Sequence, residues 1–241
     1  AAWLMYDSET MAANAQSAFA TIFFYSNHYF YSIAGYFEKS AEFQPLLHMW
    51  SLAVEEQFYL LFPLLIFAVH KFGNKKYQVF IGISIVASFI FNIWLTQTDL
   101  SGAFYFAPNR AWELLIGALL ATSLIKPVSN AILSNIGSAV GIAMILFAIF
   151  TFTNDTVFPG YAALLPTVGS FLLILLGSNE NNLIRKLLSW GPIVFIGKIS
   201  YSLYLWHWPI IVFYKYAIFR NLTTVDKVAI LSLIHISEPT R

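Results

Sequence analysis

Two adjacent carboxylates, Glu55 and Glu56, stand inside the apolar run "HMWSLAVEEQFYLLFPLLIF". If Trp50 marks the outer membrane interface, a helix places them about 8–9 Å deeper. An ionisable group at that depth is costly unless it faces protein or water. Tyr59 shares a helix face with both carboxylates. The pattern leaves two interpretations open: a structural anchor for a cation on a neighbouring helix, or a group that handles protons in a cavity.

A second charged pair occurs in "APNRAWELLIGALL". Arg110 and Glu113 are i, i+3 neighbours, and Gly117 follows one turn later, where it would admit a close helix. Pairing of these charges, within the helix or with a neighbouring helix, is the default interpretation. An arginine fixed in a membrane cavity could instead clamp a carboxylate, a phosphate or a sugar acid.

A third polar group is the stripe Ser200, Tyr204 and His207 in "GKISYSLYLWHWPIIVF". The spacing of four and then three residues puts these side chains on one face of a helix. Ser200 and His207 cannot form a nucleophile pair, because two helical turns separate them by about 10 Å. Lys198, lower on the same helix, could reach the cytoplasmic surface or meet an anionic ligand.

These placements favour one shared cavity in the outer third of a membrane, because buried charges are best satisfied together. The residues that we expect to support catalysis there are Glu55, Glu56, Arg110, Glu113 and His207. The candidates for substrate binding are His48, Trp50, Tyr59, Ser200, Tyr204 and Lys198. We expect no metal site.

The composition indicates a membrane protein. Of the 241 residues, 59% are hydrophobic and 10% are charged, whereas soluble domains carry about 25% charged residues. A net charge of +1 gives no reason to expect nucleic acid as a partner. The absence of cysteine excludes disulfides, thiolate metal sites and a cysteine nucleophile.

Apolar segments near the length of a membrane-spanning helix recur along the chain. They predict one all-α, polytopic helical bundle over residues 1–230, with six to seven transmembrane or interfacial helices. The first segment is interrupted by polar residues and could lie along the interface. The predicted segments are Ala12–Ala34, Leu46–Val69, Tyr77–Leu95, Ala111–Ile125, Ala131–Phe152, Tyr161–Leu176 and Pro192–Phe213.

The short loops predict an orientation. Loops on one side carry Lys71, Lys75, Lys76, Lys126, Arg185 and Lys186, and we expect that side to be cytoplasmic. The alternate loops, which include Lys39 and Asp155, are expected outside.

The tail "LSLIHISEPTR", residues 231–241, breaks the last apolar run. It resembles the translation of a transposase adaptor used in DNA sequencing libraries. We therefore expect this tail to be non-biological and exclude it from fold reasoning.

Three stretches together resemble the membrane acyltransferase 3 family, the O-acetylases of lipopolysaccharide O-antigen and peptidoglycan. They are "PLLHMWSLAVEEQFYLLFPLL", "FYFAPNRAWELLIGALLA" and "IGKISYSLYLWHWPIIVF", and "SNHYFYSIAGYF" fits the segment before them. The resemblance implies transfer of an acyl group, expected to be acetyl, from cytoplasmic acetyl-CoA to a hydroxyl of an extracytoplasmic glycan. It also implies a multi-pass protein of the bacterial cytoplasmic (inner) membrane.

The family's catalytic histidine belongs to an Arg–His motif in earlier helices, which this sequence does not contain. We therefore expect the chain to be an inactive fragment whose parent could carry an extracytoplasmic SGNH domain, and neither His48 nor His207 takes the missing role. The alternative is a secondary transporter, in which intramembrane charges are equally natural. An inverted repeat would favour the transporter, and none is visible, whereas the motifs favour the enzyme.

Overall fold

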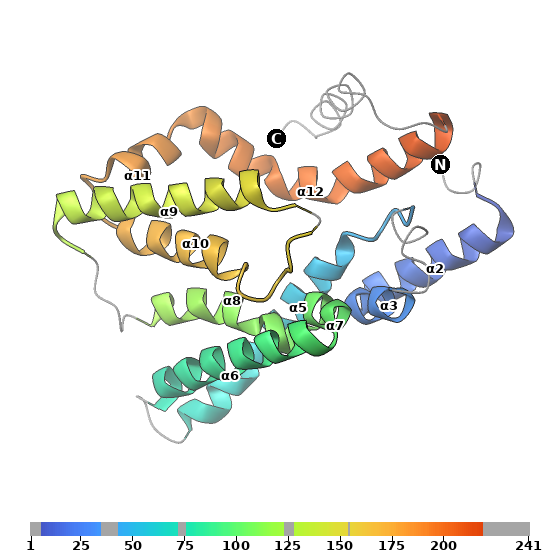
Figure 1. The fold of residues 1–241 in the computed structure, drawn as a ribbon, viewed down its shortest axis with the longest axis horizontal. Coiled ribbons are helices and arrows are strands. Elements are labelled where there is room, and N and C mark those ends of the chain that lie inside the picture. Colours follow the sequence, from blue (N-terminus) through green and yellow to red (C-terminus); the bar gives the residue numbers. More distant parts are fainter. Residues whose placement is uncertain (1–5, 35–42, 72–75, 123–127, 154, 219–241) are drawn as a thin grey trace. The chain divides into compact units, whose positions relative to one another are not determined.

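The computed structural model describes residues 6–34, 43–71, 76–122, 128–153 and 155–218. Across these ranges the regular elements are helices, without a strand, which confirms the predicted all-α fold (Figure 1). The tail 231–241 lies outside the described residues. The helices are α2 (Ser8–Ile22), α3 (Ser26–Ile33), α5 (Met49–His70), α6 (Lys76–Thr98), α7 (Leu100–Tyr105), α8 (Ala107–Ala121), α9 (Ala131–Thr151), α10 (Leu164–Leu176), α11 (Leu183–Leu188) and α12 (Gly191–Ile218).

The chain divides into two compact units. The first unit comprises residues 1–56 and 191–241, and the second comprises residues 57–190. The helix α5 contributes to both, because the division falls after Glu56.

Among the described residues, three helices are long and apolar enough to cross a membrane: Met49–His70, Tyr77–Thr98 and Ala131–Thr151. They correspond to three of the predicted segments. Their large apolar side chains are mostly exposed, as in Leu64 (62%) and Phe150 (80%). A surface of this kind suits lipid rather than water.

The first predicted segment, Ala12–Ala34, is two helices rather than one. α2 ends at Ile22 and α3 begins at Ser26. Between them Phe24 has a φ of 53°, a left-handed conformation that interrupts a right-handed helix. The buried Ser26 then donates from its hydroxyl to the Met49 carbonyl oxygen at 2.9 Å, which ties the start of α3 to the start of α5.

Three further segments, those of α8, α10 and α12, differ from their predicted bounds. α8 begins at Ala107, before the predicted Ala111, with Pro108 in the first turn, where its missing N–H costs nothing. α10 begins only at Leu164. With 15 and 13 residues, these helices measure about 22 and 20 Å, less than the ~30 Å of a hydrocarbon core. α12 is longer than predicted, at 28 residues, and continues past Pro209.

Within the second unit, α9 packs closely against α10, and α6 packs against α8 (Figure 1). A Cβ atom added at Gly141 would lie 2.8 Å from the carbonyl oxygen of Gly169. Glycine at position 141 is therefore required for the close approach of α9 to α10. In the second pair, the Ser88 hydroxyl donates to the Pro108 carbonyl oxygen at 2.6 Å and accepts the Trp112 backbone N–H at 3.0 Å. These bonds fix the first turn of α8, which carries Arg110.

Candidate functional site

The second unit contains a pair of charged residues in contact, Arg110 and Glu113 on α8. Arg110 Nε donates to Glu113 Oε1 at 3.1 Å, and Nη2 donates to Oε2 at 2.8 Å. The two side chains are 16% and 22% exposed. The i, i+3 pairing that the sequence indicated is therefore confirmed, in bidentate form.

Two aromatic rings accompany the arginine. The guanidinium carbon lies 5.9 Å from the Phe104 ring centroid and 5.8 Å from that of Phe158. Distances in this range allow attraction between the cation and the face of each ring. Neither phenylalanine was singled out from the sequence, because no local spacing connects them with Arg110.

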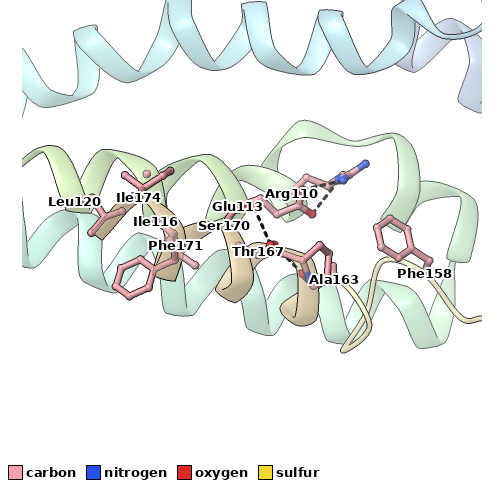
Figure 2. A pocket seen from close by; sticks show the side chains of 12 residues that line it. Arg110, Glu113, Ile116, Leu120, Phe158, Ala163, Thr167, Ser170, Phe171 and Ile174 are labelled. Atoms are coloured by element: carbon pink, nitrogen blue, oxygen red, sulfur yellow. Dashed lines mark hydrogen bonds and ion pairs between the residues drawn. The ribbon is translucent and has the colours of Figure 1, made fainter. Parts of the chain in front are cut away.

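A cavity of about 310 Å³ opens beside this pair, between α8 and α10 (Figure 2). Its polar lining consists of Arg110, Glu113, Thr167 and Ser170. Thr167 Oγ1 donates to the Ala163 carbonyl oxygen at 2.7 Å, and Ser170 Oγ donates to that of Pro166 at 2.8 Å. Figure 2 shows the apolar side chains Ile116, Leu120, Phe171 and Ile174 gathered toward the other end. Thr167 and Ser170 were also missed from the sequence, because a hydroxyl in an apolar helix is common.

The first unit holds a different polar cluster, formed by His48, Ser51, Tyr204 and His207. The Tyr204 hydroxyl donates to the His48 carbonyl oxygen and lies 2.5 Å from Ser51 Oγ. The His207 Nδ1 atom lies 2.6 Å from the Tyr204 carbonyl oxygen. The ring of His48 packs edge-on against both Tyr204 and His207, with centroids 5.1 and 5.4 Å apart. Three residues of the predicted site therefore meet here.

His48 is the most enclosed member of this cluster, with 8% of its surface exposed. Neither ring nitrogen has a hydrogen-bond partner of normal geometry within the described part of the chain. Burial, followed by repulsion from His207, lowers the pKa of this imidazole to about 4, and the backbone of Leu205 opposes the shift. His48 precedes the candidate span that begins at Met49, and its low pKa keeps the ring neutral at neutral pH.

The segment before α5 is fixed to α12 by one more bond. The Trp208 indole N–H donates to the Gln44 carbonyl oxygen at 2.8 Å. Gln44 is buried, and its side-chain oxygen has no partner in the described ranges. No local pattern points to Gln44 or Ser51, because their contacts join residues more than a hundred and fifty positions apart in the chain.

The other candidate residues are not gathered into this cluster. Ser200 is exposed, and its hydroxyl donates to the Gly197 carbonyl oxygen at 2.8 Å. It is therefore not part of the cluster that contains Tyr204 and His207. Lys198 is exposed, and Tyr59 is 58% exposed. Trp50, Glu55 and Glu56 are half-buried on α5. Convergence of Glu55, Glu56 and His207 with Arg110 and Glu113 involves both units and stays a prediction.

Comparison with known proteins identifies the family of this chain. A family model described as an acyltransferase domain matches residues 14–236. The O-acetyltransferase OatA of Staphylococcus aureus strain NCTC 8325 / PS 47 is 34% identical over 223 residues, which are 87% of this chain and 37% of that protein. OatA of strain MRSA252 gives the same values. The chain thus spans little more than a third of the length of these relatives. No solved structure matches it significantly.

Proposed function

This chain belongs to the acyltransferase domain family, as its sequence motifs predicted, and we propose that it is the membrane part of an enzyme that acetylates hydroxyl groups of a cell-envelope glycan. The observation that carries the proposal is the family match over residues 14–236, together with O-acetyltransferase relatives that are 34% identical. The helices of a multi-pass membrane protein would carry the reaction across the bilayer.

The proposed donor is acetyl-CoA on the cytoplasmic side, and the proposed acceptor is peptidoglycan or lipopolysaccharide O-antigen outside the bacterial cytoplasmic membrane. Three candidate spans and the alternation of basic and acidic loops support this direction. A membrane enzyme that joins two compartments needs polar groups at intermediate depth. Glu55, Glu56, Arg110 and Glu113 supply such groups.

The first-unit cluster supports handling of an acceptor hydroxyl. A neutral imidazole can accept a hydrogen bond from an alcohol and so orient its oxygen toward an acyl carbonyl. Bonds from Tyr204 and Trp208 hold the His48 segment, so the ring is positioned before any ligand arrives. We assign His48 to substrate positioning, with His207 and Tyr204 in supporting roles.

The test uses the complete reading frame that contains this chain, expressed in a bacterium that lacks glycan O-acetylation. Acetate released from purified peptidoglycan and lipopolysaccharide by mild alkali measures transfer. We expect released acetate from one of the two glycans, reduced about 10²-fold in His48→Ala because the acceptor hydroxyl loses its orientation. A protein that accumulates in the membrane but yields no glycan-bound acetate overturns the proposal, and transport of an acetylated solute instead would favour a transporter.

A further inference from the structure

The cavity between α8 and α10 has two chemically different ends. Arg110 and Glu113 lie at one end, beside Thr167 (Figure 2). Leu120 and Ile174 lie at the other end, about two helical turns further along their helices. A ligand that fills the cavity must therefore be elongated, with a polar part and an apolar part.

The polar end carries no net charge. The bidentate contact of Arg110 with Glu113 brings one positive and one negative group to 2.8 Å, and each compensates the field of the other. A phosphate or carboxylate placed here would meet the Glu113 carboxylate as well as the guanidinium. The geometry therefore opposes the anion clamp that Arg110 alone suggested from the sequence, and it favours an uncharged ligand.

The hydroxyl groups specify the hydrogen bonding that this ligand should offer. Thr167 and Ser170 each donate to a carbonyl oxygen of their own helix at 2.7 and 2.8 Å. A hydroxyl whose proton is committed in this way still presents its oxygen lone pairs as acceptors. The carboxylate of Glu113 is also an acceptor. The lining therefore suits a ligand that donates hydrogen bonds through amide N–H or hydroxyl groups.

Gly117 keeps the middle of the cavity open. It lines the cavity, and a Cβ atom added there would meet nothing within 4 Å. Helix packing therefore does not require glycine at this position, although glycine in a helix interior costs about 1 kcal/mol relative to alanine. The absence of a side chain is explained if the space beside Gly117 is used by a ligand.

We infer that this cavity binds the uncharged amide-and-thioester arm of the acyl donor, with its amide groups at Arg110, Glu113, Thr167 and Ser170 and its hydrocarbon part along Ile116 and Leu120. The inference rests on the proposed function, since it takes the donor to be an acyl thioester. Such an arm is linear, neutral and able to donate hydrogen bonds. A sugar ring would match the polar end alone and leave the apolar end empty.

The test measures donor kinetics of the complete protein with acetyl-CoA and with S-acetylpantetheine, which has the arm without the charged nucleotide. Gly117→Leu should fill the cavity and raise KM for both donors about tenfold, without changing KM for the glycan. Gly117→Ala should raise KM for both donors by less than Gly117→Leu, because a methyl group meets no protein atom and takes only a small part of the space proposed for the donor. Gly82→Leu is the matched control, since a Cβ at Gly82 on α6 also meets nothing within 4 Å and Gly82 does not line the cavity.

A second measurement reads out binding without turnover. The chain contains no cysteine, so a cysteine at Ile116 can be labelled with a maleimide in complete protein whose other thiols have been replaced. We expect S-acetylpantetheine to slow labelling at position 116 and not at a cysteine placed at Gly82. Protection without any acetyl transfer would support this site while the proposed function fails. Absence of protection, or a Gly117→Leu effect on KM for the glycan rather than the donor, overturns the inference.

Discussion

In the second unit, Arg110 and Glu113 neutralise each other across one helical turn. In the first unit, by contrast, the buried ring of His48 has no hydrogen-bond partner of normal geometry among the residues described. Both regions place polar atoms in a largely apolar chain. The ion pair is complete before a ligand arrives. The histidine is held by bonds to its backbone but keeps the hydrogen-bonding capacity of its ring unused. This difference matches the two roles that we propose, in which the first region offers hydrogen bonds to a substrate and the second provides a neutral wall for one.

The largest expected effect comes from breaking the ion pair. Arg110→Met leaves the Glu113 carboxylate without its partner in the ion pair. We expect the free energy of unfolding to fall by about 2–3 kcal/mol. This loss is smaller than for a fully buried pair, because both side chains are partly exposed. The double variant Arg110→Met/Glu113→Met should recover most of the loss. Unfolding of the purified protein in mixed micelles measures both values. A double variant as unstable as the single one would show that the pair contributes more than mutual neutralisation.

The next effect concerns the bonds that hold His48. Tyr204→Phe removes the hydroxyl that donates to the His48 carbonyl oxygen and contacts Ser51. We expect a loss of about 1–2 kcal/mol in the free energy of unfolding. Tyr201→Phe is the matched control, one turn away on α12 and 58% exposed, and should change stability by less than about 0.5 kcal/mol. Equal effects in the two variants would mean that the cluster does not hold the segment.

The lowered pKa of the buried His48 ring predicts that the stability of the fold depends on pH. Its pKa is lowered to about 4 in the folded protein, against 6.5 for a free histidine. The unfolded state therefore binds the proton more readily, and stability is fully present above about pH 6.5 and falls as the pH decreases toward 4. Between pH 7 and pH 5 we expect a loss on the order of 1 kcal/mol, with His207 and Tyr204 facing the ring that becomes charged.

The variant His48→Leu should flatten this dependence. His70→Leu, which changes an exposed histidine at the end of α5, should leave it in place. Unfolding midpoints at the two pH values provide the measurement. A slope that is unchanged in His48→Leu would assign the pH dependence to another group.

The sequence predicted the features that depend on neighbours along the chain. The pairing of Arg110 with Glu113 follows from i, i+3 spacing, and the spans beginning at Met49, Tyr77 and Ala131 follow from hydropathy. The break at Phe24 was not predicted, because hydropathy does not report backbone conformation, and the interrupting polar residues indicated only that the segment could lie along the interface.

Contacts between distant segments could not be predicted in the same way. The Trp208 bond to Gln44 and the Tyr204 bonds to His48 and Ser51 depend on which faces of α12 and of the segment before α5 meet. Residue spacing within one helix carries no information about that register. The sequence nevertheless selected Tyr204 and His207, because a polar stripe on an apolar helix needs a polar neighbour, while Ser200 on the same stripe is exposed.

The smallest expected effect concerns the aromatic support of the ion pair. Phe104→Leu removes a ring whose centroid lies 5.9 Å from the guanidinium carbon of Arg110 and keeps an apolar side chain. We expect a loss of about 0.5–1 kcal/mol, the range for a cation–π contact with partial exposure. In the Arg110→Met/Glu113→Met background the same substitution should cost measurably less, because the cation is absent. An equal loss in both backgrounds would assign the role of Phe104 to packing alone, without a contribution from the cation of Arg110.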